Sequence, residues 1–295
     1  MEAMRQTIDI IKPGTNTLVV KQEEVPTGLD KDVFQSVSRQ VKTSTRTDPK
    51  IVIVSSGAIA AGMLEAGATV RPGKDTEEGM TQLQRFASIG WRILHNAWDK
   101  SMSGIVTGGV LLTEQALDPQ DEGHRQERSE ALRVIRALLD NGEVPIVNEN
   151  DAIAHEEISF GDNDILAARL AVNIARSALF EGNVRLFLLS NTNGVYEDMT
   201  DPDTRIPVIH NTDQYRHLAL GTDSVNSSGG MRSKFDAADI AHAAGIDMWL
   251  YDPRIGNGHR GLAISGETGT YFPAPDLSLS AGFVPGNALA NDTIS

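Results

Sequence analysis

The stretch IVIVSSGAIAAGM occupies residues 51–63. Its four β-branched residues, Ile51 to Val54, predict a buried strand. Ser55, Ser56 and Gly57 form a turn, and the small residues after them favour a helix that packs closely on the strand. Because a helix N-terminus leaves backbone N–H groups without partners, this turn can receive an anion, although either serine could instead be a simple N-cap. The stretch therefore predicts one strand–turn–helix unit of an α/β fold.

The same alternation recurs along the chain. Short apolar runs followed by Gly, Ser, Asn or Asp predict strands, and segments with apolar residues three and four apart predict helices. The predicted strands are Thr7–Ile11, Ile51–Val54, Ile105–Leu112, Val144–Val147, Arg185–Leu189 and Ile246–Leu250. The predicted helices are Asp30–Thr47, Gln82–Lys100, Arg125–Asn141, Ile165–Glu181 and Met231–Ala244. This order predicts parallel βαβ units in a sheet covered on both faces, with ligands at the carboxyl ends of the strands.

The composition narrows the classes of function. The chain has 295 residues, 40% of them hydrophobic and 22% charged, as in an ordinary globular protein. A net charge of −14 argues against non-specific binding of nucleic acid, which depends on clustered Lys and Arg. The absence of cysteine excludes a disulfide framework and a thiolate nucleophile. Because no segment approaches the roughly 18 apolar residues of a membrane span and no signal-peptide core opens the chain, we expect a cytoplasmic protein without nucleic-acid or membrane partners.

Two lysines follow predicted strands on separate loops. In IIKPGTNT, residues 10–17, Lys12 leads into a Gly-Thr turn, where an ammonium beside backbone N–H groups suits a phosphate. In SVNSSGGMRSKFDAADIA, residues 224–241, a Ser-Ser-Gly-Gly turn opens a helix with Lys234 one turn inside it. This is not a Walker A loop, because its glycines are adjacent. Each lysine also fits a simpler interpretation, as a solvated charge or as a surface residue of a capped helix.

Carboxylates and carboxamides cluster at both ends of one loop, NENDAIAHEEISFGDND, residues 148–164. The first cluster follows a predicted strand and the second opens a predicted helix, so capping explains either one alone. Taken with the two lysines and two anion-receptive turns, they converge on one edge of the sheet. Such a set fits phosphoryl transfer, whose catalysis is mostly positioning and charge neutralisation. The charged stretch QDEGHRQER at 120–128 is interpreted instead as an exposed helix start.

These motifs resemble those of the amino acid kinase family, from about Ile8 to Phe272. The matching segments, in the family's order and approximate spacing, are KPGTNTL, IVIVSSGAIAAG, LLT, RALLDNGEVPIVNENDAIA, FGDNDILAA, LLSNTNGVY and SSGGMRSKFDAADIAHAAGI. The resemblance implies a three-layer αβα sandwich with a mostly parallel central sheet. It also implies an amino acid kinase domain over 1–272, which leaves 273–295 as a mobile C-terminal tail and no additional C-terminal RNA-binding-like domain.

Within that family, the motifs are most similar to those of the branch that phosphorylates the side-chain carboxylate of glutamate. The resemblance therefore implies ATP as phosphoryl donor, Mg²⁺ carried with the nucleotide, and an acyl phosphate product that feeds proline biosynthesis. It also implies a homo-oligomer, either a dimer or a tetramer, and no metal ion held by the protein itself. Two alternatives stay open: a diverged paralogue acting on another carboxylate, a carbamate or a phosphate, and a non-catalytic ligand-binding regulator.

The resemblance also implies roles for single residues. Lys12 and Lys234 match the lysines that neutralise the transferring phosphoryl group, and Asp164 matches the catalytic carboxylate that organises them. The residues that match amino-acid-binding positions are Ser56, Gly57, Asp151 and Asn163. The residues that match nucleotide-binding positions are Lys12, Gly14, Ser190, Asn191, Ser228, Gly229, Gly230, Met231, Arg232, Ser233 and Lys234. Chemically, Asp151 can take a substrate ammonium, while Ser56 and Asn163 can donate to substrate carboxylates; a γ-carboxylate is already ionised at neutral pH, so no general base is required.

Four positions depart from the family's pattern. Pro13 removes an N–H where the phosphate loop begins. Ser190-Asn191 stands in place of Thr-Asp, which removes a charge near the nucleotide, and Trp91 stands in place of a glutamine. Ser227-Ser228 replaces a Gly-Thr pair. All four lie near nucleotide or loop positions, and none removes an assigned lysine or aspartate.

Overall fold

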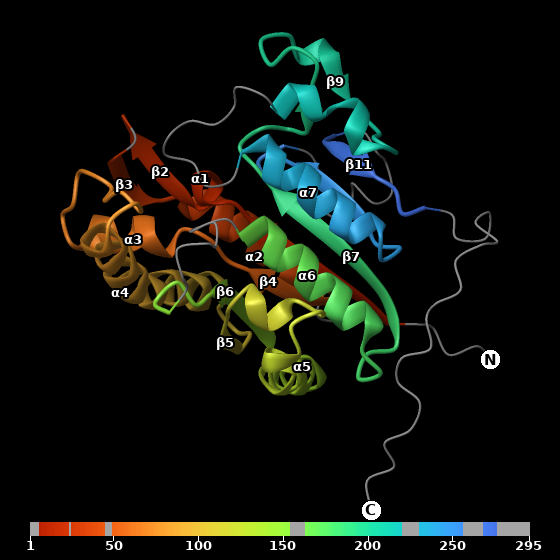
Figure 1. The fold of residues 1–295 in the computed structure, drawn as a ribbon, viewed down its shortest axis with the longest axis horizontal. Helices are drawn as coiled ribbons and strands as arrows, with labels where there is room; N and C mark the ends of the chain where they lie inside the picture. The colour runs from red at the N-terminus through yellow and green to blue at the C-terminus, as the bar shows by residue number, and fades with distance from the viewer. Residues whose placement is uncertain are drawn as a thin grey trace, which may run out of the picture.

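A seven-stranded sheet lies at the centre of the computed structural model, which describes residues 6–23, 25–44, 49–153, 163–219, 230–255 and 268–275 (Figure 1). In sheet order the strands are β11 (Thr270–Phe272), β10 (Asp247–Tyr251), β7 (Gly182–Leu189), β1 (Gln6–Pro13), β4 (Lys50–Val54), β6 (Val144–Glu149) and β5 (Thr107–Leu112). Neighbouring strands are parallel except β10 and β11. The predicted, mostly parallel sheet is confirmed.

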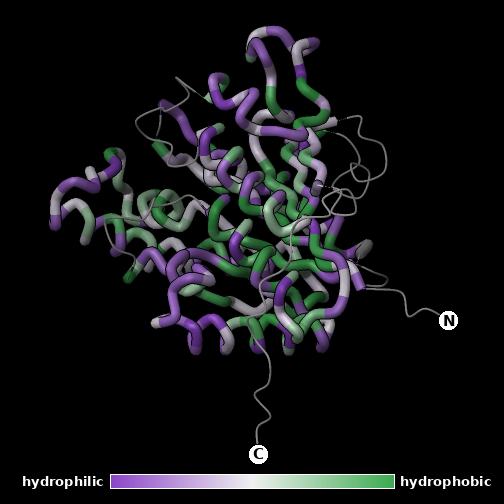
Figure 2. The backbone as a smooth tube through the Cα atoms, turned by 45° about the vertical axis from the view of Figure 1, so that its right-hand side comes forward, coloured by the Kyte–Doolittle hydropathy of each residue, from purple (hydrophilic) through white to green (hydrophobic). Residues whose placement is uncertain are grey.

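Helices cover both faces of the sheet and complete the predicted αβα sandwich (Figure 1). One face carries α2 (Lys31–Ser44), α3 (Ala58–Glu65) and α4 (Glu77–Ser101), and the other carries α5 (Arg125–Asp140), α6 (Asn163–Arg176) and α7 (Met231–His242). Successive residues of β4 serve opposite layers, since Ile51 and Ile53 join one hydrophobic core while Val52 and Val54 join the other. Figure 2 accordingly shows hydrophobic segments at the centre and hydrophilic ones around the rim.

Several short elements lie outside these layers, and the sequence patterns did not predict them. The chain forms α1 (Thr15–Leu18) and then a hairpin of β2 (Val19–Gln22) and β3 (Val25–Leu29). A smaller hairpin joins β8 (Val195–Tyr196) to β9 (Arg205–Ile206). Single 3₁₀ turns occur at Gln115–Leu117, Glu122–His124, Pro202–Thr204, Thr212–Gln214 and Arg216–Ala219. These segments lack the continuous apolar run that marks β4, because β2 ends in Lys21 and Gln22, β3 contains Pro26 and Gly28, and β8 and β9 have only two residues each.

Every predicted strand and helix is present, although some ends differ. Helix α4 begins at Glu77, ahead of the predicted Gln82, because the Thr76 side chain caps it by accepting a hydrogen bond from the Gly79 N–H (3.1 Å). Helix α6 ends at Arg176, short of the predicted Glu181, where a turn around Ser177 leads into β7. The charged stretch at 120–128 is a helix start, as predicted, since α5 begins at Arg125.

The connections place a topological switch point between β1 and β7. The chain leaves β1 toward β4 on one side and leaves β7 toward β10 on the other. The loops after these two strands therefore diverge and leave a crevice at their carboxyl ends, where ligands bind in open α/β sheets. The start of the crevice is tied across the strands, because the Gly14 N–H and the Thr17 hydroxyl both donate to the Leu189 carbonyl (3.0 and 3.2 Å).

Candidate active site

A cavity of about 290 Å³ opens at this edge of the sheet. Its lining comes from the loops that follow β1, β4, β6 and β7 and from the starts of α6 and α7. The β2–β3 hairpin, α3 and the segment between α3 and α4 complete it. The residues assigned from the sequence that line it are Lys12, Gly14, Gly57, Asp151, Asn163, Ser190, Asn191 and Lys234. Residues far apart in the chain thus meet at one site. This site lies at the carboxyl ends of the strands, where the sequence predicted a ligand.

One buried carboxylate joins the two lysines. Asp164, in the first turn of α6, lies with Oδ1 2.5 Å from Lys12 Nζ and with Oδ2 3.2 Å from Lys234 Nζ. The Ser233 hydroxyl also donates to Oδ2 (2.9 Å). The Asp164 side chain is only 1% exposed, and those of Lys12 and Lys234 are 4% and 11% exposed. The predicted bridging position of Asp164 between the lysines is present in the structure, and the contacts hold both ammoniums in defined places.

The charge of this group is set by competition between burial and the lysines. Burial alone would raise the pKa of Asp164, because it disfavours the ionised form. The Lys12 and Lys234 ammoniums outweigh that cost and hold the pKa of this carboxyl well below its usual range. The cluster therefore carries two positive charges and one negative charge at neutral pH, with a net positive charge facing the cavity.

Asn163, next to Asp164, is fixed by the ends of two strands. Its Nδ2 donates to the Ser55 carbonyl and to Asn148 Oδ1, the latter at 3.2 Å. The Ser55 hydroxyl in turn accepts from the Trp98 indole N–H (3.0 Å). Both hydrogens of the Asn163 amide thus bond inside the protein in this structure, and the amide holds the turn after β4 against the start of α6. Its donation to a substrate carboxylate stays a prediction.

Two buried oxygens at the acceptor side have no hydrogen-bond partner among the described residues. They are Asp151 Oδ1 and the Ser56 hydroxyl, in side chains that are 5% and 1% exposed. Burial raises the pKa of Asp151 to about 7, against a smaller opposing effect of the Arg71 guanidinium and the Asn148 side chain. Since buried polar atoms are rarely left unpaired, both oxygens suit a polar ligand. Asp151 lines the cavity. Ser56 does not, but the next residue in the chain, Gly57, does.

The predicted nucleotide-binding residues fall into three groups. Five of them line the cavity, namely Lys12, Gly14, Ser190, Asn191 and Lys234. Gly230, Met231, Arg232 and Ser233 do not line it: Met231 packs against the hydrophobic core, and the Ser233 hydroxyl binds Asp164. Ser228 and Gly229 lie outside the described residues, as do residues 154–162 of the loop between the two polar clusters and residues 276–295 of the predicted tail.

Two of the departures from the family pattern have structural explanations. Pro13 is the last residue of β1 and pairs in register with Leu189, and the following Gly14 N–H is already bonded to the Leu189 carbonyl. Trp91 packs against the His95 ring, with the ring centroids 5.3 Å apart, and is not among the residues that line the cavity. Trp91, which stands where the family pattern has glutamine, therefore packs between α4 and Gly109 of β5.

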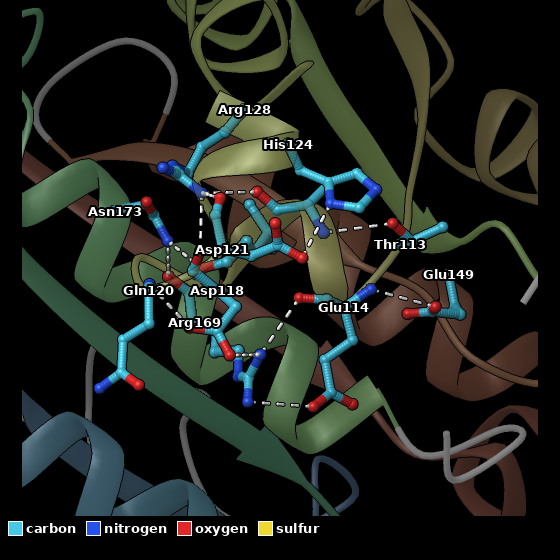
Figure 3. Close-up of polar contacts among 12 residues, drawn as sticks. Thr113, Glu114, Asp118, Gln120, Asp121, His124, Arg128, Glu149, Arg169 and Asn173 are labelled. Atoms are coloured by element: carbon cyan, nitrogen blue, oxygen red, sulfur yellow. Dashed lines mark hydrogen bonds and ion pairs between the residues drawn. The ribbon is translucent and has the colours of Figure 1, made fainter. Parts of the chain in front are cut away.

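A polar network outside the predicted site holds the loop after β5 (Figure 3). Arg169 of α6 donates to the Glu114 carbonyl (3.3 Å) and pairs with Asp118 Oδ2 (3.2 Å), while Arg128 of α5 donates to the Asp118 carbonyl (2.7 Å). The Glu114 N–H donates to Glu149 Oε1 (3.1 Å), which anchors the loop to the end of β6. The network makes this loop a fixed wall beside the strand end that carries Asp151.

Sequence reasoning missed two charged residues near Asp151. Glu149, within the Asn-Glu-Asn-Asp motif, is 6% exposed, and burial raises its pKa to about 8. Arg71 lies on the segment between α3 and α4 and lines the cavity. The motif gave a signal for Glu149, but nothing beside Arg71 in the chain points to a ligand, because its proximity to Asp151 arises only from the tertiary structure.

No group of three or more His, Cys, Asp or Glu side chains within the described residues is placed to hold a metal ion. Within the same residues, no helix is both long and apolar enough to cross a membrane.

Comparisons with known proteins agree with this architecture. The profile of the amino acid kinase family matches residues 10–252. A glutamate 5-kinase of Thermus thermophilus is 37% identical over 271 residues, which cover 90% of this chain and 67% of that protein. A glutamate 5-kinase of Streptomyces avermitilis is also 37% identical, over 285 residues that cover 92% of this chain and 69% of that protein.

Two solved structures share the fold. An isopentenyl phosphate kinase superimposes with a TM-score of 0.59 at 17% identity, covering 90% of this chain and 99% of that one. A carbamate kinase from Giardia superimposes with a TM-score of 0.57 at 16% identity, covering 92% and 99%. The profile match and the identity to the curated relatives extend over most of the chain, so the protein belongs to the amino acid kinase family.

Proposed function

We propose that the protein is a glutamate 5-kinase, which transfers the γ-phosphoryl group of ATP to the side-chain carboxylate of glutamate. The observation that carries this proposal is the buried Lys12–Asp164–Lys234 cluster, which faces a cavity also lined by Asp151. One buried oxygen of Asp151, Oδ1, has no hydrogen-bond partner among the described residues. The name shared by the curated relatives supports the same activity. The product is an acyl phosphate, the activated form that opens proline biosynthesis.

The lysine cluster suits the chemistry of this reaction. A transferring phosphoryl group spreads negative charge over its oxygens while it passes between donor and acceptor. Lys12 enters from β1 and Lys234 from α7, and Asp164 fixes both ammoniums before the substrates bind. Such preorganised charges stabilise a transition state because they need no reorganisation during the reaction. The acceptor carboxylate is already ionised at neutral pH, so the site needs no general base.

The acceptor side favours an amino acid over the other acceptors of the fold. Asp151 offers a buried carboxylate oxygen that lacks a partner among the described residues, which suits an ammonium. A carbamate or an isoprenoid phosphate carries no such cation. This difference is the reason for placing the chain with the amino-acid-phosphorylating members.

Mg²⁺ fits the site when it is carried by the nucleotide. Mg²⁺ is commonly bound through substrate phosphates and its own waters with few protein ligands, and the described residues form no protein metal cluster. The ion would neutralise charge on the phosphates of ATP. Ser190, Asn191 and Lys234 are the described residues that we assign to the nucleotide side. The amino acid kinase domain over 1–272, a homo-oligomeric assembly and a cytoplasmic location stay predictions.

The test is trapping of the acyl phosphate with hydroxylamine. We expect hydroxamate formation that depends on both ATP and glutamate. Lys234→Ala and the bulkier Lys234→Met should lower kcat by about 10²–10³-fold, as expected when one transition-state charge is lost. The exposed Lys74 provides a matched control, and Lys74→Ala should leave kcat unchanged. A chain that forms no hydroxamate from any acidic amino acid would overturn the proposal, as would full activity in both folded Lys234 variants.

A further inference from the structure

Arg71 is a cavity residue that the phosphoryl-transfer chemistry does not use. It lies half-buried on the segment between α3 and α4, on the same cavity lining as Asp151. Within the described part of the chain, its guanidinium makes no hydrogen bond and no direct ion pair. Burial lowers the pKa of Arg71, and its electrostatic attraction to Asp151 opposes that effect. A guanidinium on the lining of a cavity can donate hydrogen bonds to a ligand that binds there.

Asp151 lines the same cavity and carries the opposite charge when it is ionised. Its Oδ1 is buried and has no partner among the described residues, although Arg71 is close enough to influence its pKa. Arg71 and Asp151 thus present opposite charges to one cavity and form no direct ion pair within the described residues. A ligand in this cavity could present a cation to Asp151 and an anion to Arg71.

The other cationic side chains that line the cavity are Lys12, Lys21 and Lys234, and they lie on other elements. Lys12 and Lys234 are bound to Asp164 at the phosphoryl side, and Lys21 belongs to the β2–β3 hairpin. Arg71 is the cation whose charge acts on Asp151. An arginine also matches a carboxylate well, because its planar guanidinium can donate two parallel hydrogen bonds.

We propose that Arg71 binds the α-carboxylate of the acceptor while Asp151 binds its α-ammonium, so that the two side chains together select an α-amino acid. The inference rests on the proposed function for the identity of the reaction, but it assigns a specificity residue that the reaction itself does not require. With the head group held in this way, the side-chain carboxylate of the acceptor extends toward the Lys12–Asp164–Lys234 cluster.

Glutamate analogues that lack one group each provide the test. 4-Aminobutyrate lacks the α-carboxylate, and glutarate lacks the α-ammonium. We expect Arg71→Met to lower kcat/KM for glutamate by about 10–100-fold, the worth of a charged hydrogen-bonded pair, and to leave kcat/KM for 4-aminobutyrate within about 3-fold of the wild type. Turnover is counted as ADP release, which registers every acceptor. Asp151→Asn should show the reciprocal pattern, with a loss for glutamate and little change for glutarate.

Arg92 supplies the matched control for removal of an arginine. Its side chain is 69% exposed and pairs only at the surface with Glu65, so Arg92→Met should affect neither acceptor. Arg71→Lys should recover part of the discrimination, because it restores the charge without the fork of the guanidinium. A purely structural role for Arg71 predicts equal losses for glutamate and 4-aminobutyrate, and that result would overturn the inference.

Equilibrium binding separates this inference from the proposed function. Calorimetric titration with glutamate and 4-aminobutyrate, in the presence of a non-hydrolysable ATP analogue, needs no turnover. If the wild type forms no hydroxamate but Arg71→Met weakens only glutamate binding, the proposed kinase activity is wrong and the role of Arg71 holds. If hydroxamate forms normally and the variant weakens both ligands alike, the activity holds and the role of Arg71 is wrong. Absence of glutamate binding to the wild type would also contradict it.

Discussion

Glu149 is a carboxyl that the fold buries for a structural purpose. It ends β6, two residues before Asp151, and its Oε1 accepts a hydrogen bond from the Glu114 N–H (3.1 Å). This bond favours the carboxylate and lowers the pKa, but a neutral carboxyl can still accept it, and the effect of burial is larger. Burial raises the pKa of Glu149 to about 8, so the protonated form is present in the folded protein at neutral pH. The side chain therefore couples the stability of this strand end to pH.

We expect Glu149→Gln to stabilise the protein increasingly as the pH rises from about 5 to 8. In the unfolded chain Glu149 loses its proton near pH 4.5, but in the folded protein it keeps the proton until about pH 8. The unfolded state is thus favoured as the pH rises through this window, by at most about 1.4 kcal/mol per pH unit. Glutamine copies the protonated form and removes this slope. Urea unfolding of both proteins at pH 5.5 and pH 8 measures the difference.

The exposed Glu122 gives the control for this substitution. Its side chain is 76% exposed, so Glu122→Gln should change the free energy of unfolding equally little at both pH values. A Glu149→Gln protein that is destabilised by the same amount at pH 5.5 and pH 8 would show that Glu149 is ionised in the folded state.

At the scale of elements, the acceptor side depends on the contact between α3 and α4. These helices pack backbone to backbone: a Cβ added at Gly90 of α4 would lie 1.7 Å from the Ala58 carbonyl oxygen, and one added at Gly62 of α3 would lie 1.8 Å from that of Phe86. Helix α3 begins directly after Gly57, whose φ of 92° also requires glycine. The close packing therefore sets where the turn at Gly57 meets the cavity.

We expect Gly90→Ala to weaken both folding and acceptor binding. The added methyl must push α4 away from α3, which costs about 2–3 kcal/mol in the free energy of unfolding and displaces the turn that lines the cavity. KM for glutamate should rise more than KM for ATP. Thermal unfolding and steady-state kinetics check the two effects. Gly73→Ala is the control, since a Cβ at Gly73 meets nothing within 4 Å, and a Gly90→Ala protein as stable as this control would contradict the packing argument.

The strands and helices that the sequence predicted are those marked by a continuous apolar run or by apolar residues three and four apart. Ile51 to Val54 and the small residues after them predicted β4 and α3, and both are present. The short strands β2, β3, β8 and β9 were missed because none of them carries a continuous apolar run like that of β4. The start of α4 was misplaced because the helix was judged from its apolar face, which begins later than its Thr76 cap.

At the scale of the whole molecule, the sheet brings together side chains that the sequence could only relate by their strand ends. Lys12, Asp164 and Lys234 were predicted to meet, and they do. Arg71 could not be predicted, because it belongs to a loop whose path depends on the packing of α3 and α4. Likewise, the internal bonds of the Asn163 amide depend on the approach of β4 to α6. The motifs thus predicted that the two lysines and Asp164 meet, whereas the position of Arg71 and the bonds of the Asn163 amide follow only from the tertiary structure.

Binding of the acceptor should stabilise the whole fold to an extent that depends on pH. Glutamate that binds the folded state raises the free energy of unfolding by an amount set by its concentration and dissociation constant. Because the pKa of Asp151 is about 7, the free protein must release a proton there before the carboxylate can bind an ammonium. Affinity should therefore fall about tenfold between pH 8 and pH 6, and the stabilisation by saturating glutamate should fall by about 1.4 kcal/mol. Thermal unfolding without nucleotide, which excludes titration of the ATP phosphates, measures this as a loss of a few degrees in the shift of Tm.

Asp151→Asn removes the titrating group near Arg71 but leaves Glu149 in place, so its weaker stabilisation by glutamate should not vary with pH. Equal pH dependence in the variant and the wild type would assign the proton to Glu149 instead.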